Sequence, residues 1–274
     1  MDAHWTEADI EVNGVQLHYY RTGHGDKPPL LLIHGFSDTG LLWTPVAREL
    51  EADYDVIMPD MRGHGRSTRV QPDENVDMAA DVADLIRNLG LARPVVGGHS
   101  MGASVTYQLG LRFPDLVRAL FLEDPGWRIT WPERAPGAEN PMVTWAKSLP
   151  SKTMDELLAD YHKNHPNWSE ELIQLMCESK TLLDPTVAEI TTARMRSREY
   201  NWLTTLQEIT HPLLLVTGNP ELGGIVTPEV VAKVRDLNPK VRIINVPDVG
   251  HLIRFDNYDA FMAALRPFLR QLPA

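Results

Sequence analysis

A serine flanked by glycines is the first feature of this sequence that suggests chemistry. Gly98-His99-Ser100-Met101-Gly102 fits the pattern G-x-S-x-G, and it joins an apolar run to a segment rich in small residues. In a strand–turn–helix context this pattern holds a serine on a sharp, strained turn, and the glycines let the strand and helix approach closely. The N–H of Met101 would open the helix and could donate to an oxyanion. The segment therefore predicts a nucleophilic serine.

Such a serine needs a general base, because an unactivated hydroxyl is a poor nucleophile near neutral pH. Histidine is the usual base, and the sequence contains ten histidines. Residue type alone cannot choose among them. Their positions relative to the predicted strands and helices must decide.

Apolar runs alternate with segments of helical periodicity along most of the chain. The predicted strands are residues 15–20, 29–34, 54–59, 94–99, 117–123, 212–218 and 241–247. The inner ones are continuous Val/Ile/Leu runs, as expected for strands covered on both faces. The predicted helices are residues 40–50, 76–89, 101–112, 227–237 and 256–271. This alternation predicts an α/β fold with a mostly parallel central sheet flanked by helices.

One stretch, residues 125–205, lacks a convincing buried strand and shows helical periodicity broken by prolines. Five of the seven tryptophans lie in it: Trp127, Trp131, Trp145, Trp168 and Trp202. A helical insertion between two strands would cover the carboxyl ends of the strands, where open α/β sheets bind ligands. We therefore expect a core of residues 1–124 and 206–274 and a helical cap of residues 125–205, called the cap segment below.

Four segments, each at the end of a predicted strand, together resemble the α/β-hydrolase superfamily. They are His34-Gly35-Phe36, the run DMRGHGRS from Asp60 to Ser67, the G-x-S-x-G turn and Gly250-His251. The resemblance covers nearly all of the chain outside the cap segment. It implies an α/β-hydrolase fold with the helical cap inserted after the sixth strand of that fold. The sixth and seventh strands of the fold correspond here to residues 117–123 and 212–218.

The resemblance also assigns roles. It implies that His251, between the last strand and the final helix, is the general base for Ser100. It implies that the N–H of Phe36 joins that of Met101 as an oxyanion donor, while His34 shapes its loop. Asp60, Arg62 and His64 are expected to be hydrogen-bonded residues of a tight turn rather than chemical groups.

The acid that orients His251 has more than one candidate. Relatives usually carry an Asp on the loop after the seventh strand, and the matching residue here is Glu221. Either carboxylate could hold the imidazole tautomer and stabilise the imidazolium. Some branches take the acid from the end of the sixth strand, where Glu123 and Asp124 stand. We expect Glu221, with Glu123 and Asp124 as alternatives.

These residues predict a serine hydrolase that cleaves a carboxylic ester or lactone through an acyl-serine intermediate. A bulky apolar substrate is expected, because the cap segment combines its tryptophans with several methionines: Met142, Met154, Met176 and Met195. No metal and no organic cofactor are expected, because zinc-type Cys/His spacing and a Gly-rich dinucleotide fingerprint are both absent from the sequence.

Other chemistries on this scaffold remain as alternatives. The reactions of relatives that use an Asp nucleophile are excluded, because this chain has Ser100 at that position. Carbon–carbon bond hydrolases typically have Asn before the serine and Gly-Gly after the Met, whereas this chain has His99 and Ala103. Perhydrolysis without a cofactor uses the same triad. A receptor-like protein that only binds its ligand is the alternative from another class.

Composition restricts partners and location. With 26 Lys and Arg against 37 Asp and Glu, the formal charge is −11, which disfavours nucleic acid and anionic membrane surfaces. No apolar run reaches the roughly 20 residues of a membrane span, and no signal peptide is evident. Cys177 alone cannot form an intrachain disulfide. We expect a cytoplasmic enzyme acting on a small molecule; the oligomeric state is left open.

Overall fold

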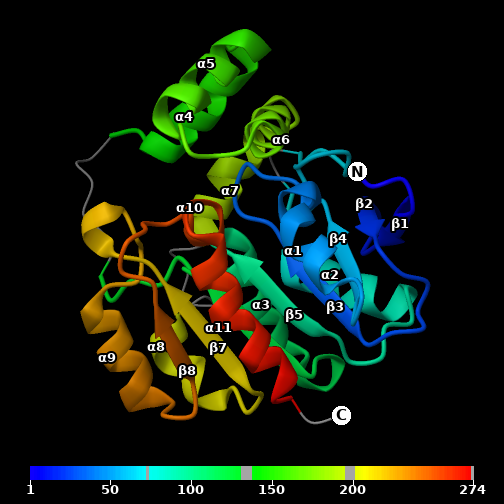
Figure 1. Cartoon of the computed structure of the whole chain (residues 1–274), viewed down its shortest axis with the longest axis vertical. Coiled ribbons are helices and arrows are strands. Elements are labelled where there is room, and N and C mark those ends of the chain that lie inside the picture. The colour runs from blue at the N-terminus through cyan, green and yellow to red at the C-terminus, as the bar shows by residue number, and fades with distance from the viewer. Residues whose placement is uncertain (72–73, 131–137, 195–200, 273–274) are drawn as a thin grey trace.

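The computed structural model describes residues 1–71, 74–130, 138–194 and 201–272 (Figure 1). In this part of the chain, eight strands form one sheet in the order β1-β2-β4-β3-β5-β6-β7-β8. The strands are β1 (Thr6–Val12), β2 (Val15–Arg21), β3 (Pro29–Ile33), β4 (Asp55–Pro59), β5 (Val95–His99), β6 (Ala119–Glu123), β7 (Leu213–Thr217) and β8 (Arg242–Asn245). The β1–β2 and β2–β4 pairs are antiparallel, and every other pair is parallel. The predicted α/β class is confirmed.

Strand β1 is missing from the sequence-based expectations. Its residues are mostly exposed, because it is the edge strand of the sheet and pairs only with β2 in the described residues. An edge strand that faces solvent needs no continuous apolar run. The sequence signal that reveals the inner strands is therefore absent from it.

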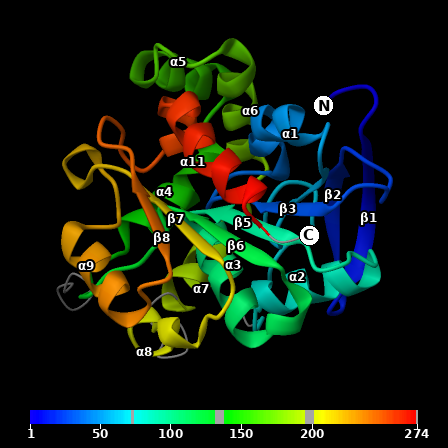
Figure 2. The same cartoon turned by 60° about the horizontal axis from the view of Figure 1, so that its bottom comes forward.

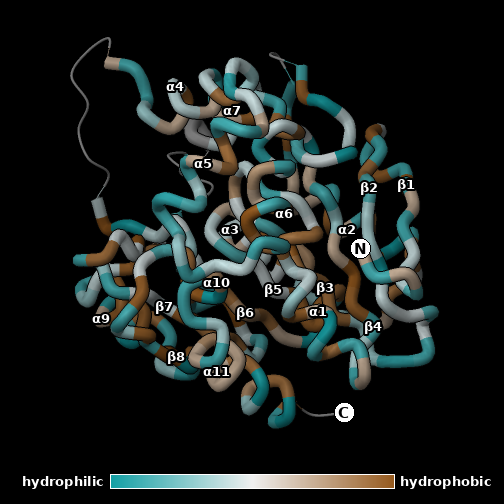
Figure 3. The backbone as a smooth tube through the Cα atoms, turned by 45° about the horizontal axis from the view of Figure 1, so that its top comes forward, coloured by the Kyte–Doolittle hydropathy of each residue, from teal (hydrophilic) through white to brown (hydrophobic). Residues whose placement is uncertain are grey.

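The inner strands are buried on both faces, and β3 shows how. Leu31 and Ile33 point into one apolar cluster together with residues of α2 (Met78–Asn88), α3 (Met101–Arg112) and α9 (Pro228–Leu237). Leu30 and Leu32 point into a second cluster with residues of α1 (Thr44–Leu50) and α11 (Tyr258–Arg270). Alternate residues of a strand face opposite sides of a sheet. Two helical layers therefore cover the sheet (Figure 2), and the most hydrophobic backbone lies in its central strands (Figure 3).

The helices of the core lie close to their predicted positions. They are α1 (Thr44–Leu50), α2 (Met78–Asn88), α3 (Met101–Arg112), α9 (Pro228–Leu237), α10 (Ile253–Asp256) and α11 (Tyr258–Arg270). Asp77, Thr227 and Asn257 cap α2, α9 and α11 by accepting backbone N–H groups of the first turn. Such caps satisfy donors that a helix leaves unpaired at its start.

Between β6 and β7 the chain carries α4 (Pro141–Ser148), α5 (Met154–Asn164), α6 (Glu170–Thr181), α7 (Thr186–Arg194) and α8 (Trp202–Thr205). In Figure 1, α4, α5 and α6 lie together above the core. They contact the loops that follow core strands: the Asp184 N–H donates to the Gly63 carbonyl, and the ring of Trp145 lies 6.3 Å from that of Phe36. This places the inserted helices against the carboxyl end of the parallel strands. None of the helices in the described ranges is long and apolar enough to cross a bilayer.

Candidate active site

Ser100 occupies a sharp turn between β5 and α3. Its φ of 52° and ψ of −108° are unusual for a residue other than glycine, and such strain persists only where the surrounding structure enforces it. The Ser100 N–H is fixed by the Glu123 carbonyl on the neighbouring strand, at 2.9 Å. The predicted strand–turn–helix context is present.

The glycines on either side of Ser100 allow backbones to touch. A Cβ on Gly102 would lie 2.3 Å from the Ile33 carbonyl oxygen, and one on Gly98 would lie 2.3 Å from the Gly102 carbonyl oxygen. The start of α3 therefore packs directly on the end of β3. This close approach brings Met101, whose N–H has no acceptor within its own helix, near the loop that carries Phe36.

His251 lies after β8, and its ring forms a hydrogen bond with a carboxylate. Its Nδ1 is 2.6 Å from Oδ2 of Asp124, a side chain that is fully buried. The two oxygens of Asp124 also accept the N–H groups of Ile225 and Val226, at 2.8 and 3.1 Å. An ionised carboxylate can only accept a hydrogen bond, so Nδ1 of His251 must donate one. In a neutral imidazole the single ring proton is therefore on Nδ1, and Nε2 keeps its lone pair. That is the tautomer that a general base requires.

The expectation that Glu221 orients His251 is not what the structure shows. Glu221 is exposed, in the short 3-10 helix Pro220–Leu222, and its N–H bonds to the Asn219 side chain. The loop after β7 turns its backbone toward the site, since the Ile225 and Val226 N–H groups bind Asp124. The alternative position at the end of β6 therefore supplies the partner of His251, and the loop after β7 supplies donors to that partner.

Glu123, the other candidate acid, binds Arg254 instead of His251. Its two oxygens accept from the N–H and from Nη1 of Arg254, at 2.9 and 2.6 Å. Burial raises the pKa of Glu123, and the charge of Arg254 opposes that rise. The adjacent carboxylates of Glu123 and Asp124 thus have separate partners.

The polar residues after β3 and β4 form hydrogen bonds within and between these two loops. His34 Nε2 accepts the Met61 N–H, and Asp60 accepts the N–H groups of Gly40 and Arg66. Burial lowers the pKa of His34 and, further, that of His64. These side chains shape the loops beneath the site, in line with the expectation for this segment.

Two further residues form hydrogen bonds to loops of the site, and neither was predicted from the sequence. His99 Nε2 lies 3.0 Å from the carbonyl oxygen of His251, and the two rings are 4.6 Å apart. Lys180, a buried residue of α6, donates to the Ser37 carbonyl at 3.0 Å and to Oδ1 of Asp38 at 3.1 Å. A lysine on an otherwise amphipathic helix gives no sequence signal for such a contact, because lysine is normally exposed.

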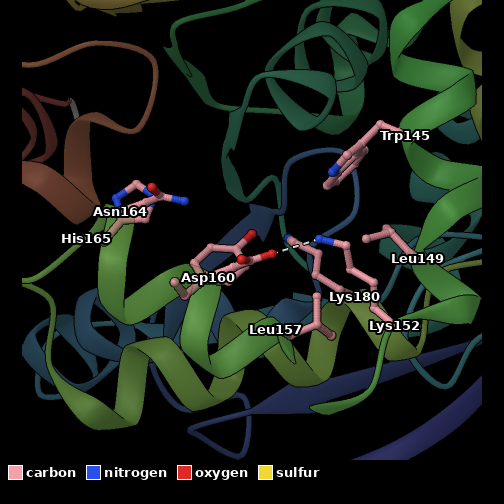
Figure 4. A pocket seen from close by; sticks show the side chains of 9 residues that line it. Trp145, Leu149, Lys152, Leu157, Asp160, Asn164, His165 and Lys180 are labelled. Carbon is pink, nitrogen blue, oxygen red and sulfur yellow. Dashed lines mark hydrogen bonds and ion pairs between the residues drawn. The ribbon is translucent and has the colours of Figure 1, made fainter. Parts of the chain in front are cut away.

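A cavity of about 200 Å³ lies within the cap segment, next to the Phe36 loop. Its walls include the apolar side chains of Trp145, Leu149 and Leu157 and an ion pair between Lys152 and Asp160, with Nζ and Oδ2 at 2.8 Å (Figure 4). Burial raises the pKa of Tyr161, which also lines it. The cavity wall therefore combines apolar and charged side chains.

Most of the tryptophans of the cap segment pack against other residues. Trp127 stacks on Trp202 with ring centroids 5.0 Å apart, and Trp168 stacks on His165 at 3.9 Å. Trp145 is 39% exposed and lines the cavity. Trp131 and Met195 lie outside the described residues.

No group of three or more His, Cys, Asp or Glu side chains in the described ranges is arranged to hold a metal ion.

The sequence matches the family described as the alpha/beta hydrolase fold over residues 28–258. N-formylmaleamate deformylase of Pseudomonas putida is 28% identical over 267 residues, covering 95% of both chains. Lipase 1 of Psychrobacter immobilis is 27% identical over 94% of this chain and 86% of the lipase. The crystal structure of the N-formylmaleamic acid deformylase from Pseudomonas putida S16 superimposes with a TM-score of 0.79 at 25% identity, over 95% of this chain and all of that one. The protein belongs to the α/β-hydrolase family and is a hydrolase.

Proposed function

We propose that this hydrolase cleaves a carboxylic ester or lactone through an acyl-serine intermediate, with Ser100 as nucleophile, His251 as base and Asp124 as the acid that orients His251. The observation that carries the proposal is the 2.6 Å contact between His251 Nδ1 and Asp124 Oδ2, beside the strained turn of Ser100. A lipase relative that aligns over 94% of this chain supports ester chemistry.

In the first half of the reaction, Ser100 Oγ attacks the carbonyl carbon while His251 Nε2 takes the hydroxyl proton. The carbonyl electrons move to its oxygen, and the N–H groups of Phe36 and Met101 stabilise the resulting oxyanion. The tetrahedral intermediate then collapses. The carbon–oxygen bond to the alcohol breaks, and the alcohol leaves with the proton from His251.

In the second half, water attacks the acyl-serine and gives a proton to His251. The second tetrahedral intermediate releases the carboxylic acid, and the proton returns to Ser100 Oγ. In a lactone the alcohol and acid remain one molecule, so the same steps open the ring. Asp124 stays ionised throughout and stabilises the imidazolium that forms in each half.

Hydrolysis of an amide is the second candidate. The relative that aligns over 95% of both chains is named for removing a formyl group from N-formylmaleamate, in which the formyl group is attached to nitrogen. The same triad serves both reactions, and the difference lies in protonation of the leaving group. A matched ester and amide with the same acyl group would separate the two by kcat/KM.

A fluorophosphonate probe tests the nucleophile. The proposal expects one labelled residue, mapped by peptide mass spectrometry to Ser100. Ser100→Ala should lose the label and most ester turnover, leaving roughly 10³–10⁴-fold catalysis over water from oxyanion stabilisation and binding. Ser151→Ala, at an exposed serine of the cap segment, is the control and should behave like wild type. Labelling that persists in Ser100→Ala would contradict the proposal.

A further inference from the structure

Beneath the candidate triad lies a buried ion pair, Glu123 and Arg254. Their side chains are almost completely buried, with exposed fractions of 0% and 2%. The guanidinium of Arg254 lies between two aromatic rings, with Cζ 3.9 Å from the centroid of Trp43 and 4.0 Å from that of Phe255. Cation–π contacts of this kind hold the guanidinium in place, in addition to its ion pair with Glu123.

The pair touches every part of the triad without belonging to it. The Glu123 carbonyl accepts the N–H of Ser100, and the next residue along the chain is Asp124. The Glu123 carboxylate accepts both the backbone N–H and Nη1 of Arg254, three residues after His251. One residue of β6 is therefore joined to the serine turn, to the acid and to the histidine loop.

The acid also needs external support. Asp124 has a φ of 41°, in the left-handed region that costs energy for residues other than glycine. A residue in that conformation would relax unless its neighbours held it. Three sets of contacts oppose relaxation: Glu123, anchored through Arg254, the N–H groups of Ile225 and Val226, and the Val216 carbonyl, which accepts the Asp124 N–H at 2.9 Å.

A purely stabilising role fits the ion pair poorly. Within the described residues, Nε and Nη2 of Arg254 are buried and have no hydrogen-bond acceptor. Buried ion pairs often stabilise a fold no better than apolar residues of similar volume, whereas they do specify one geometry in several systems. The incomplete hydrogen bonding of Arg254 favours the second role.

We propose that Glu123 and Arg254 are positioning residues that hold Asp124 and His251 in hydrogen-bonding register. The inference rests on the proposed triad. The pair does not touch substrate; it sets the distance between Nδ1 of His251 and Oδ2 of Asp124. A displacement of about 1 Å in a reacting group can cost about 10²-fold in rate, so small shifts of either loop would reduce turnover.

Removing both charges of the Glu123–Arg254 pair together distinguishes a positioning role of the pair from a role in the stability of the fold. Glu123→Met with Arg254→Met leaves no unpaired buried charge, so Tm should stay near that of wild type. The proposal expects kcat to fall roughly 10–100-fold, the range seen when partners behind an active group are removed, with KM little changed. In wild type the short hydrogen bond to Asp124 should shift the ¹H NMR signal of the His251 Nδ1 proton downfield, and in the double variant this signal should weaken or move upfield.

The control is another ion pair, between β2 and β4 in the other half of the sheet, whose carboxylate is buried and whose guanidinium is partly exposed. Arg21 binds Asp55 at the start of β4, with Nη2 and Oδ2 at 2.5 Å. Arg21→Met with Asp55→Met should leave kcat and the Nδ1 proton signal unchanged. Arg254→Lys serves if the Glu123/Arg254 double variant does not fold, because it keeps the charge but loses the planar contact; it should lower kcat about 10-fold.

The outcomes distinguish this inference from the proposed function. If the folded double variant, or Arg254→Lys in its place, retains wild-type kcat while Ser100→Ala and Asp124→Asn are inactive, the triad stands and the positioning role is wrong. If Ser100→Ala and Asp124→Asn remain fully active, the proposed function itself fails. A fall in kcat with an unchanged Tm and an altered Nδ1 signal supports both.

Discussion

Asp124 reaches His251 from the end of β6, and its carboxylate binds three partners: Nδ1 of His251 and the N–H groups of Ile225 and Val226. The donors come from the loop after β7, in which relatives of this family commonly carry the acid. Two loops thus build one acidic position, one with a side chain and the other with its backbone. Substitutions in the two loops should have very different effects.

Asp124→Asn should reduce kcat/KM by roughly 10⁴-fold, because it favours the wrong imidazole tautomer and removes the charge that stabilises the imidazolium. Glu221→Gln should leave kcat/KM unchanged, since Glu221 is exposed. Steady-state kinetics on an activated ester at one pH would compare them, with circular dichroism to verify folding. Full activity in Asp124→Asn together with an inactive Glu221→Gln would reverse the assignment.

Lys180 should be important for stability, because it joins α6 to the loop that carries Phe36. Lys180→Met leaves Asp38 buried without its ion-pair partner, and breaking a buried pair in this way costs about 3–5 kcal/mol. Urea denaturation measures the change in the free energy of unfolding. Lys152→Met is the control: its pair with Asp160 is largely exposed, so the cost should be about 0–1 kcal/mol. Equal effects of the two substitutions would show that Lys180 is not a structural link.

Among the described tryptophans of the cap segment, Trp145 is the best placed to contact a large acyl group. It lines the cavity and contacts the ring of Phe36. Trp145→Ala should lower kcat/KM for esters with bulky apolar acyl groups about 10-fold or more, because it removes apolar contact area of the order of 150–250 Å². Acetate esters should be much less affected.

Leu222→Ala provides the comparison for Trp145→Ala. Leu222 is 57% exposed and does not line the cavity, so the ratio of kcat/KM between long and short acyl esters should stay at the wild-type value. A Trp145→Ala enzyme with the same ratio would mean that Trp145 packs against Phe36 without selecting substrates.

Stability should decrease as the pH falls below about 6.5. Burial lowers the pKa of His34, His64 and His99 below the ordinary value of 6.5. Below pH 6.5 the unfolded chain therefore binds protons at these positions that the folded protein does not. Each such histidine lowers the free energy of unfolding by up to about 1.4 kcal/mol per pH unit, down to its folded pKa.

Urea denaturation from about pH 7.5 to about pH 5.5 measures this slope. The buried carboxyls of Asp60, Asp81 and Glu123 have raised pKa values because of burial, so each acts in the opposite direction over the interval between its ordinary and its folded pKa. His64→Gln should reduce the slope, whereas the exposed His24→Gln should not. A flat profile in the wild type would contradict the prediction.

The sequence by itself determined those features that depend on local spacing. The G-x-S-x-G turn, the alternation of buried strands with helices, and the histidine between the last strand and the final helix each involve a few neighbouring residues. Their physical causes are local too: a strained turn needs glycines beside it, and a strand covered on both faces needs a continuous apolar run. Strand β1 could not be predicted in this way, because an exposed edge strand carries no continuous apolar run.

Only the tertiary structure decided which carboxylate meets His251. Glu123 ends a buried strand, Asp124 follows it directly and Glu221 follows another. Nothing in the neighbouring residues distinguishes their partners. The choice depends on the path of two loops in space: Gly223, with a φ of 98°, ends the turn that leaves Glu221 in solvent, and the backbone that follows reaches Asp124. The contacts of Lys180 with Ser37 and of Arg254 with Glu123 are of the same kind. They join residues more than 100 positions apart, and a hydrogen bond between distant segments exists only once the packing of the whole fold has brought its donor and acceptor together.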